Sequence, residues 1–204
     1  IDTEVIDELE LAAGVGQQVS EITERAMSGE LDFQESLRQR VSFLAGLPVQ
    51  TLSEIAQQLP LTEGVEVLFP ALKTLGYKTA IISGGFSYFG NFLKAKLGVD
   101  YVYANELSII DGKLTGEVVR PVVDAQAKAD ILSELAGKEG IAMEQTIAVG
   151  DGANDIEMLA AAGLGIAYHA KAIVRDSSDH AISQLGLDSI LFLLGISDRE
   201  HDNH

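Results

Sequence analysis

The sequence predicts an α/β fold in which a parallel β-sheet carries helices on both faces. From Glu63 onward, short apolar runs typical of buried strands alternate with helical patterns, as they do in parallel-sheet proteins. Before that point, from Val5 to about Leu59, the periodicity is helical throughout. We therefore expect a helical unit over residues 5–60 and an α/β core over residues 61–204.

Gly- or Pro-bearing joints separate the predicted helices of the first part, which cover residues 5–14, 17–27, 33–46 and 51–59. In the core, the predicted helices cover residues 65–76, 86–98, 124–140 and 153–163, and the strands cover residues 77–83, 101–107, 146–150 and 164–169. A small β-hairpin, at about residues 106–120, is expected to turn at Asp111-Gly112. Asp124 is the expected N-cap of the third core helix.

The composition excludes several kinds of chemistry. The 204 residues include no cysteine, which excludes disulfides, thiolate metal sites and a cysteine nucleophile. With 31 acidic and 14 basic side chains the formal net charge is -17, so the surface repels nucleic acid and anionic membranes, and we expect neither as a partner. No apolar run is long enough to span a membrane and no signal-like pattern begins at Ile1, so we expect a soluble, cytoplasmic protein.

Polar and flexible residues are concentrated between a predicted strand and a predicted helix, in the stretch TIAVGDGANDIEML. Ligands of open parallel sheets bind beyond the carboxyl ends of the strands, and Asp151 lies at such an end. The hard carboxylate oxygens of Asp151 and Asp155 suit Mg²⁺, which commonly shares its coordination with waters and a phosphate. The alternative is that Asp151 and Asn154 only cap the following helix.

Two further strand-to-helix junctions carry groups that suit phosphate. Ser83, Gly84 and Gly85 are expected to open a helix, where they offer a hydroxyl and several N–H donors to an anion. Lys128 lies in the first turn of the predicted helix 124–140, where a cation opposes the helix dipole, so an anion is expected nearby. The alternatives are an ordinary Ser-Gly-Gly turn and a solvated lysine. Together, the three junctions predict a phosphate site.

Three segments, in this order and spacing, resemble motifs of the haloacid dehalogenase-like phosphatases: ISGGF, DAQAKAD and VGDGANDIEML. Within that superfamily, TEVIDELE, ITERAMSGELDFQESLRQRV and YANEL with DGKLTGEV are similar to the phosphoserine phosphatases, and the resemblance covers nearly the whole chain. It implies a Rossmann-like parallel-sheet core with an inserted helical cap and a β-hairpin. It also implies Mg²⁺-dependent hydrolysis of O-phospho-L-serine to L-serine and phosphate through an aspartyl-phosphate intermediate.

The resemblance assigns the phosphate end of the substrate to four residues. Ser83 and Gly84 would bind the transferring phosphoryl group, and Lys128 would neutralise its charge and that of the attacked nucleophile. Asn154 would contact the phosphate or the groups that support it.

The resemblance assigns the metal and the amino-acid end of the substrate to four more. Asp151 would coordinate Mg²⁺, and Asp155 would order the surroundings of the metal ligand. Glu4 and Arg40 would bind the ammonium and the carboxylate of the serine moiety, because a zwitterion needs one anionic and one cationic partner. The alternatives are a carboxylate at a helix start for Glu4 and an ordinary surface charge for Arg40.

The resemblance also implies a nucleophile that the sequence does not contain. The family transfers the phosphoryl group to an aspartate of an Asp-x-Asp-Ser-Thr motif on the first core strand, a few residues before the position of Glu4. We expect this strand, the general acid/base and two of the three protein contributions to Mg²⁺ to lie ahead of Ile1, and the 204 residues alone to be inactive. Met27 and Phe33 would lie in the cap close to the substrate, or would simply be core residues.

Two other functions stay open. A different small phosphomonoester could be the substrate, in which case the pair of Glu4 and Arg40 would have no use. The chain could instead be a non-catalytic phosphate-binding or interaction module. A homodimer is a candidate assembly.

Overall fold

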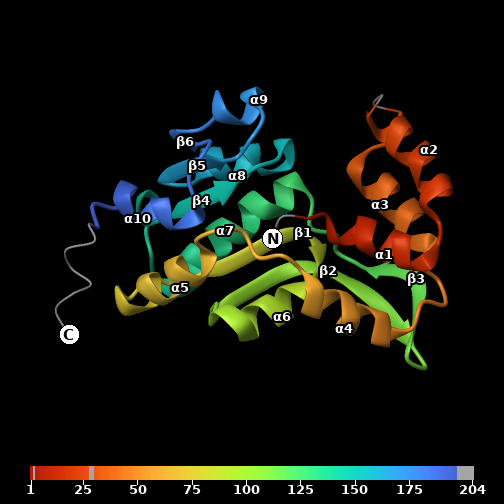
Figure 1. Ribbon diagram of the computed structural model, residues 1–204. Helices are drawn as coiled ribbons and strands as arrows, with labels where there is room; N and C mark the ends of the chain where they lie inside the picture. The colour runs from red at the N-terminus through yellow and green to blue at the C-terminus, as the bar shows by residue number, and fades with distance from the viewer. Residues whose placement is uncertain (2, 28–29, 197–204) are drawn as a thin grey trace. The chain divides into compact units, whose positions relative to one another are not determined.

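The computed structural model describes residues 1, 3–27 and 30–196, and the chain in it divides into two units (Figure 1). Unit 1 comprises residues 1–60, 80–96 and 100–124, and unit 2 comprises residues 61–79, 97–99 and 125–204. We predicted another division, into a cap over residues 5–60 and a core over residues 61–204. That division differs from the two units of the structure, and it stays a prediction.

Four helices open unit 1, as the periodicity predicts: α1 (Val5–Ala13), α2 (Gly16–Met27), α3 (Phe33–Ser42) and α4 (Val49–Gln58). Local chemistry sets their ends. Gly14 ends α1 in the left-handed conformation, with φ of 70°, which a residue without a Cβ adopts most readily. The side chain of Asp32 caps α3 by accepting a hydrogen bond of 2.7 Å from the backbone N–H of Glu35.

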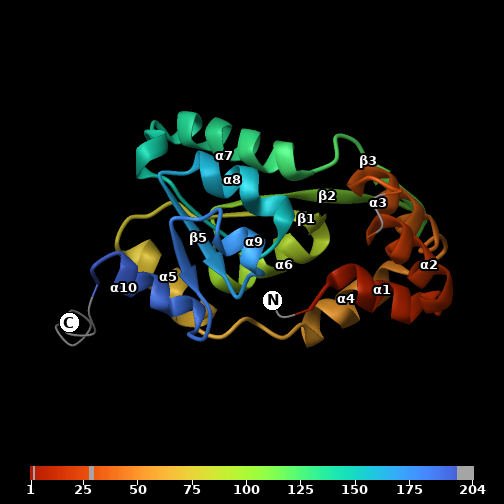
Figure 2. The ribbon, with the colours of Figure 1, turned by 90° about the horizontal axis from the view of Figure 1, so that it is seen from above.

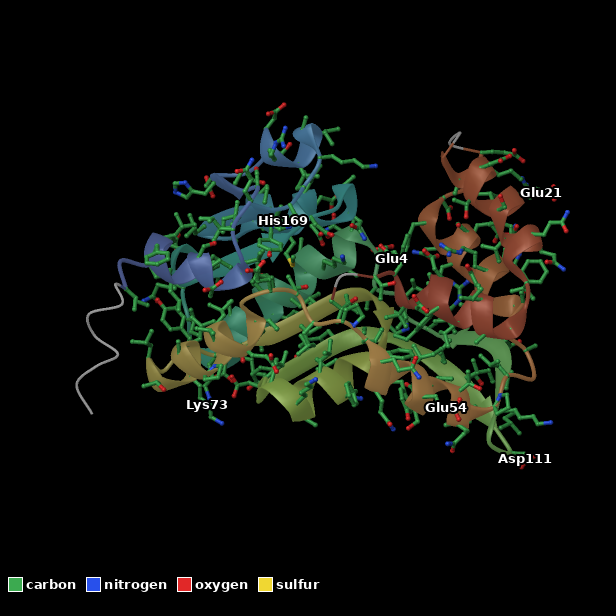
Figure 3. The ribbon with its side chains drawn as sticks, viewed as in Figure 1. Glu4, Glu21, Glu54, Lys73, Asp111 and His169 are labelled. Atoms are coloured by element: carbon green, nitrogen blue, oxygen red, sulfur yellow. The ribbon has the colours of Figure 1, made fainter. Side chains whose placement is uncertain are left out.

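The sheet of unit 1 contains β1 (Ala80–Phe86), β2 (Tyr101–Ile110) and β3 (Lys113–Val119), and α6 (Ser87–Leu97) connects β1 to β2. The strands β1 and β2 are parallel, whereas β2 and β3 form an antiparallel hairpin. The predicted turn is confirmed, because Asp111 and Gly112 join the two strands with φ of 49° and 72° (Figure 3). One long strand, β2, replaces the two separate elements that we expected over residues 101–110.

The prediction that Ser83, Gly84 and Gly85 open a helix is wrong. All three lie inside β1, and α6 begins only at Ser87. A contact from the neighbouring strand explains the difference: the Asn105 side chain of β2 donates to the Gly84 carbonyl at 2.7 Å. The local contact, in which the Ser83 hydroxyl accepts from the Gly85 N–H at 3.0 Å, is typical of a turn, so the local pattern alone did not indicate a strand.

Unit 1 has one hydrophobic cluster, to which its helices and strands both contribute. Leu9 of α1, Val41 of α3 and Leu52 of α4 are almost completely buried in it, together with Phe86 of β1 and Leu107 of β2. The helical segment and the β-hairpin therefore share a core, because the apolar stripes of α1, α3 and α4 face the same cluster as the strands do.

The second sheet, in unit 2, is parallel throughout and contains β4 (Ile147–Gly150), β5 (Leu164–Tyr168) and β6 (His180–Ile182), in that spatial order. The longer helices of this unit are α5 (Val65–Thr74), α7 (Ala125–Glu139) and α8 (Ile156–Ala161). Figure 2 shows α7 and α8 side by side, as their contacts also indicate. The α/β class and the parallel strand pairing are thus confirmed.

Several short elements of unit 2 were not predicted, because segments of three or four residues carry too little periodicity. They are β6, α9 (Ala172–Arg175), α10 (Ile190–Leu193), and the 3₁₀ helices η1 (Met143–Gln145) and η3 (Leu187–Ser189). The 3₁₀ helix η2 (Ala153–Asp155) forms the first turn of the helix predicted over residues 153–163. The core of this unit joins Leu68 and Ala71 of α5 to Ile166 of β5, Ile182 of β6 and Ile190 of α10. Within the described residues, no helix is both long and apolar enough to cross a membrane.

Candidate active site

A buried ion pair joins α7 to the polar loop that follows β4. The ammonium of Lys128 donates a hydrogen bond of 2.7 Å to Oδ1 of Asp155, and the two side chains are 6% and 8% exposed. A charge removed from water needs a partner with good geometry, and each of these residues supplies it for the other. The anion expected beside Lys128 is therefore present as a protein carboxylate, and the alternative of a solvated lysine is wrong.

The second oxygen of Asp155 holds the backbone of the loop. Oδ2 accepts hydrogen bonds from the N–H groups of Asp151, at 3.1 Å, and Gly152, at 3.0 Å. This close approach requires a glycine at position 150, since a Cβ there would lie 2.5 Å from the Cβ of Asp155. Lys128 and Asp151 thus depend on the same carboxylate, and the loop is fixed by side chain and backbone together.

The side chain of Asp151 is exposed, in contrast to that of Asp155. Its carboxylate is a hard oxygen donor and fits Mg²⁺, which takes one or two protein carboxylates and completes its coordination with waters and phosphate oxygens. In the part of the chain that the structure describes, no three His, Cys, Asp or Glu side chains gather into a metal site. Asp151 is the candidate ligand that this loop offers to solvent.

The alternative reading, in which Asp151 and Asn154 cap the following helix, does not match the hydrogen bonds of this loop. Among the described residues, the carboxylate that accepts backbone hydrogen bonds there belongs to Asp155 rather than to Asp151 or Asn154. Asn154 is half-buried, and its Oδ1 would lie 2.4 Å from a Cβ at Gly152. Asn154 therefore packs closely against the loop backbone.

In unit 1, Ser83 and Gly84 lie at the end of β1 next to an aromatic ring and a buried amide. The ring of Phe33 lies 3.2 Å from where a Cβ on Gly84 would be, so Phe33 packs directly over this glycine. Asn105 is completely buried, donates to the Gly84 carbonyl at 2.7 Å and accepts from the Val123 N–H at 2.7 Å. The sequence analysis missed Asn105, although a lone amide inside the apolar strand YVYANEL was a usable signal.

Arg40 is bound to two carboxylates of α1. Its Nε and Nη2 donate to the two oxygens of Glu10 at 2.7 Å and 2.8 Å, and Nη2 also donates to Asp7 at 2.5 Å. Burial acts to lower the pKa of Arg40, but the hydrogen bonds and charges of Glu10 and Asp7 outweigh it and raise the pKa above its ordinary value. The alternative of an ordinary surface charge is wrong, since the side chain is only 19% exposed.

The predicted site residues fall into separate groups. Lys128, Asp151, Asn154 and Asp155 form one group in unit 2, whereas Ser83, Gly84 and Phe33 form another in unit 1. Glu4 is exposed and lies directly before α1, as Figure 3 shows, and it makes no side-chain cap. Met27 ends α2, and its side chain is outside the described part of the chain. Their joint action on one substrate stays a prediction.

Comparison with known proteins decides the family. A model described as haloacid dehalogenase-like hydrolase matches residues 1–163. The chain belongs to this hydrolase family. This membership agrees with the α/β fold, with the aspartates of the loop after β4 and with the buried lysine of α7.

Curated relatives of this hydrolase include proteins named phosphoserine phosphatase. The one from Archaeoglobus fulgidus is 51% identical over 95% of the chain and 57% of its own length. The one from Vibrio cholerae is 50% identical over 95% of the chain and 59% of its own length. The chain therefore spans under two thirds of these proteins. It spans 90% of the Methanocaldococcus jannaschii protein of the same name, with 46% identity over 94% of the chain.

Solved structures similar to this hydrolase support the fold. The unliganded structure of a probable phosphoserine phosphatase from Vibrio cholerae matches with a TM-score of 0.89 and 50% identity, over 93% of this chain and 59% of that one. A structure titled as a phospho-aspartyl intermediate analogue of phosphoserine phosphatase matches with a TM-score of 0.85 and 45% identity, over 96% and 93% of the two chains. A substrate-bound phosphoserine phosphatase complex matches with a TM-score of 0.84 and 45% identity, over 96% and 92%.

Proposed function

We propose that the protein hydrolyses O-phospho-L-serine to L-serine and phosphate through an aspartyl-phosphate intermediate, with Mg²⁺. The observation that carries the proposal is the 46% identity to a phosphoserine phosphatase of which the chain spans 90%. The buried pair of Lys128 and Asp155 supports it, because a desolvated cation beside a loop of N–H donors suits phosphoryl chemistry.

In this proposal the chain's own groups bind and stabilise the phosphoryl group. Lys128 keeps two N–H donors beyond the one that Asp155 receives, and its charge offsets the charge of the transferring group. Ser83 offers its hydroxyl, Gly84 its N–H, and Asn154 contacts the phosphate or the groups around it. Since Asp155 fixes the positions of both Lys128 and the Asp151 loop, little reorganisation is needed when charge develops.

Asp151 would hold Mg²⁺ through its exposed carboxylate, while Asp155 keeps the Asp151 backbone in place. The metal, when bound, would draw negative charge from the phosphoryl oxygens and orient them. The proposal assigns the nucleophile to an aspartate of an Asp-x-Asp-Ser-Thr motif, which the 204 residues do not contain. A cytoplasmic location and a homodimeric assembly stay predictions.

Glu4 and Arg40 would bind the amino-acid end of the substrate. Glu4 would pair with the ammonium group and Arg40 with the carboxylate. A second candidate, hydrolysis of another small phosphomonoester, is favoured by one observation: Arg40 already has two carboxylate partners, Glu10 and Asp7. If those partners saturate the guanidinium, the enzyme has no group left for a substrate carboxylate.

A comparison of two substrates tests the proposal in the complete protein. We expect kcat/KM for O-phospho-L-serine to exceed that for O-phosphoethanolamine, which lacks the carboxylate, by about 30-fold or more, as a charge-assisted contact in a partly desolvated site provides about 2 kcal/mol or more. Chelation of Mg²⁺ by EDTA should abolish both activities. Equal kcat/KM values would favour the second candidate, and no hydrolysis of either ester would overturn both.

A further inference from the structure

Glu10 and Arg40 form a bidentate ion pair between α1 and α3, and Glu10 has no part in the function proposed so far. The carboxylate of Glu10 is 5% exposed, and its two oxygens accept from Nε and Nη2 of Arg40 at 2.7 Å and 2.8 Å. A parallel pair of hydrogen bonds fixes both the place and the plane of the guanidinium. The pair joins residues 30 positions apart, so it also fixes Arg40 relative to α1.

The contacts of Arg40 involve Nε and Nη2 of the guanidinium but not Nη1. Glu10 and Asp7 together accept from Nε and from Nη2. No described residue accepts a hydrogen bond from Nη1, which carries two of the five N–H donors of the group. The Arg40 side chain as a whole is 19% exposed, so it is not completely closed off from solvent.

The acidic residues that face Arg40 continue a row that begins at the start of α1. Glu4, Asp7 and Glu10 are spaced by three residues, a spacing that places neighbouring members on the same side of a helix. Glu4 is the proposed partner of the substrate ammonium. Glu10 therefore fixes a cation relative to the same helix whose start carries that anion, as the recognition of a zwitterion requires.

We propose that Glu10 is a positioning residue, which clamps the Nε–Nη2 edge of Arg40 so that Nη1 is presented to the carboxylate of the substrate. The inference rests on the proposed function, since it needs Arg40 to bind a substrate carboxylate. The two partners of Arg40 have unequal roles in this proposal. The buried Glu10 fixes the orientation of the guanidinium, whereas Asp7, whose side chain is 61% exposed, contributes little to fixing it.

The test compares Glu10→Gln, Glu10→Asp and the wild type in the complete protein, with two substrates. Glu10→Gln removes the charge of the clamp, and Glu10→Asp keeps the charge but withdraws it by one methylene. For both we expect KM for O-phospho-L-serine to rise about 5- to 50-fold with kcat nearly unchanged, the range of coupling within one network. KM for O-phosphoethanolamine should stay the same, because that ester does not use Arg40.

Three controls separate positioning from simple stability. Glu54→Gln makes the same chemical change at an exposed position of α4 and should leave both KM values unchanged. In an Arg40→Ala background, Glu10→Asp should no longer affect KM for phosphoserine. Asp7→Asn should change that KM less than about 3-fold, as expected for an exposed pair.

Distinct outcomes overturn the inference and the proposed function. A KM for phosphoserine that is unchanged or falls in both Glu10 variants, or that rises equally for the two esters, would show that Glu10 does not position Arg40 for the substrate. If Glu10→Gln does not fold, Glu10→Asp decides the matter alone. A wild-type protein that does not prefer phosphoserine would instead refute the proposed function, whatever the Glu10 variants do.

Discussion

Asp155 illustrates how one carboxylate can serve several neighbours at once. It accepts one hydrogen bond from Lys128 and two from loop N–H groups, while it is only 8% exposed. The loop can approach this carboxylate only because position 150 has no side chain. The hydrogen bonds that Asp155 makes to the loop therefore depend on the glycine at position 150.

Substitution at Gly150 tests this dependence. A Cβ at this position would overlap Asp155, so Gly150→Ala should lower the free energy of unfolding by about 1–3 kcal/mol and should weaken phosphate binding as well. Gly137 is the matched control, since a Cβ there meets nothing within 4 Å and the residue lies inside α7. Gly137→Ala should be neutral or stabilising by up to about 1 kcal/mol. Urea unfolding of both variants measures the difference, and equal effects would contradict the packing argument.

At the scale of elements, the start of α3 combines a cap with a local ion pair. Asp32 caps the helix, and the carboxylate of Glu35 accepts from Arg38 and Gln39 within the same two turns. The helix carries Phe33 at its beginning and Arg40 near its end, so a stably folded helix is needed to hold both side chains in place. These contacts are local, and they explain why the sequence alone located this helix well.

The pH dependence of Glu35 tests the local ion pair. Hydrogen bonds from Arg38 and Gln39 lower the pKa of Glu35 from 4.5 to about 2. Because the folded-state pKa is depressed, the stabilisation is fully present above pH 4.5 and is lost as the pH falls through about 2. We expect NMR titration to place the Glu35 carboxyl near that value, and Arg38→Gln to raise it. A wild-type pKa near 4.5 would contradict the pair, and its contribution to stability is small because both groups are exposed.

For the whole molecule, the proposed function needs residues from distant segments to act on one substrate. The proposed roles divide between Ser83 and Gly84 in unit 1 and Lys128 and Asp151 in unit 2. Membership of the hydrolase family and the similarity to phosphoserine phosphatases support these proposed roles.

A metal titration of the complete protein tests the proposed role of Asp151. Asp151→Asn should raise the Mg²⁺ concentration needed for half-maximal activity by about 10-fold or more and lower kcat, since a neutral amide is a poorer ligand for a hard cation. The thermal unfolding midpoint should hardly change, because the side chain is exposed. Asp176→Asn, another exposed aspartate of unit 2, is the control and should behave as the wild type. An unaltered Mg²⁺ requirement in Asp151→Asn would exclude the residue as a ligand.

The sequence by itself determined the α/β class, the main helices, the parallel strands and the hairpin turn at Asp111-Gly112. It could do so because periodicity, caps and glycines act over a few neighbouring residues. The same local signals misplaced Ser83 to Gly85, since Ser-Gly-Gly is compatible with a helix start and with an extended strand end.

Only the tertiary structure decided which distant side chains meet. Asn105 holds Gly84 from 21 residues away, Lys128 reaches Asp155 across 27, and Glu10 clamps Arg40 across 30. The sequence shows that each of these residues is polar, but it does not show which residue is its partner. The physical reason is that burial makes a polar group dependent on one particular neighbour, and that neighbour is chosen by packing rather than by position along the chain.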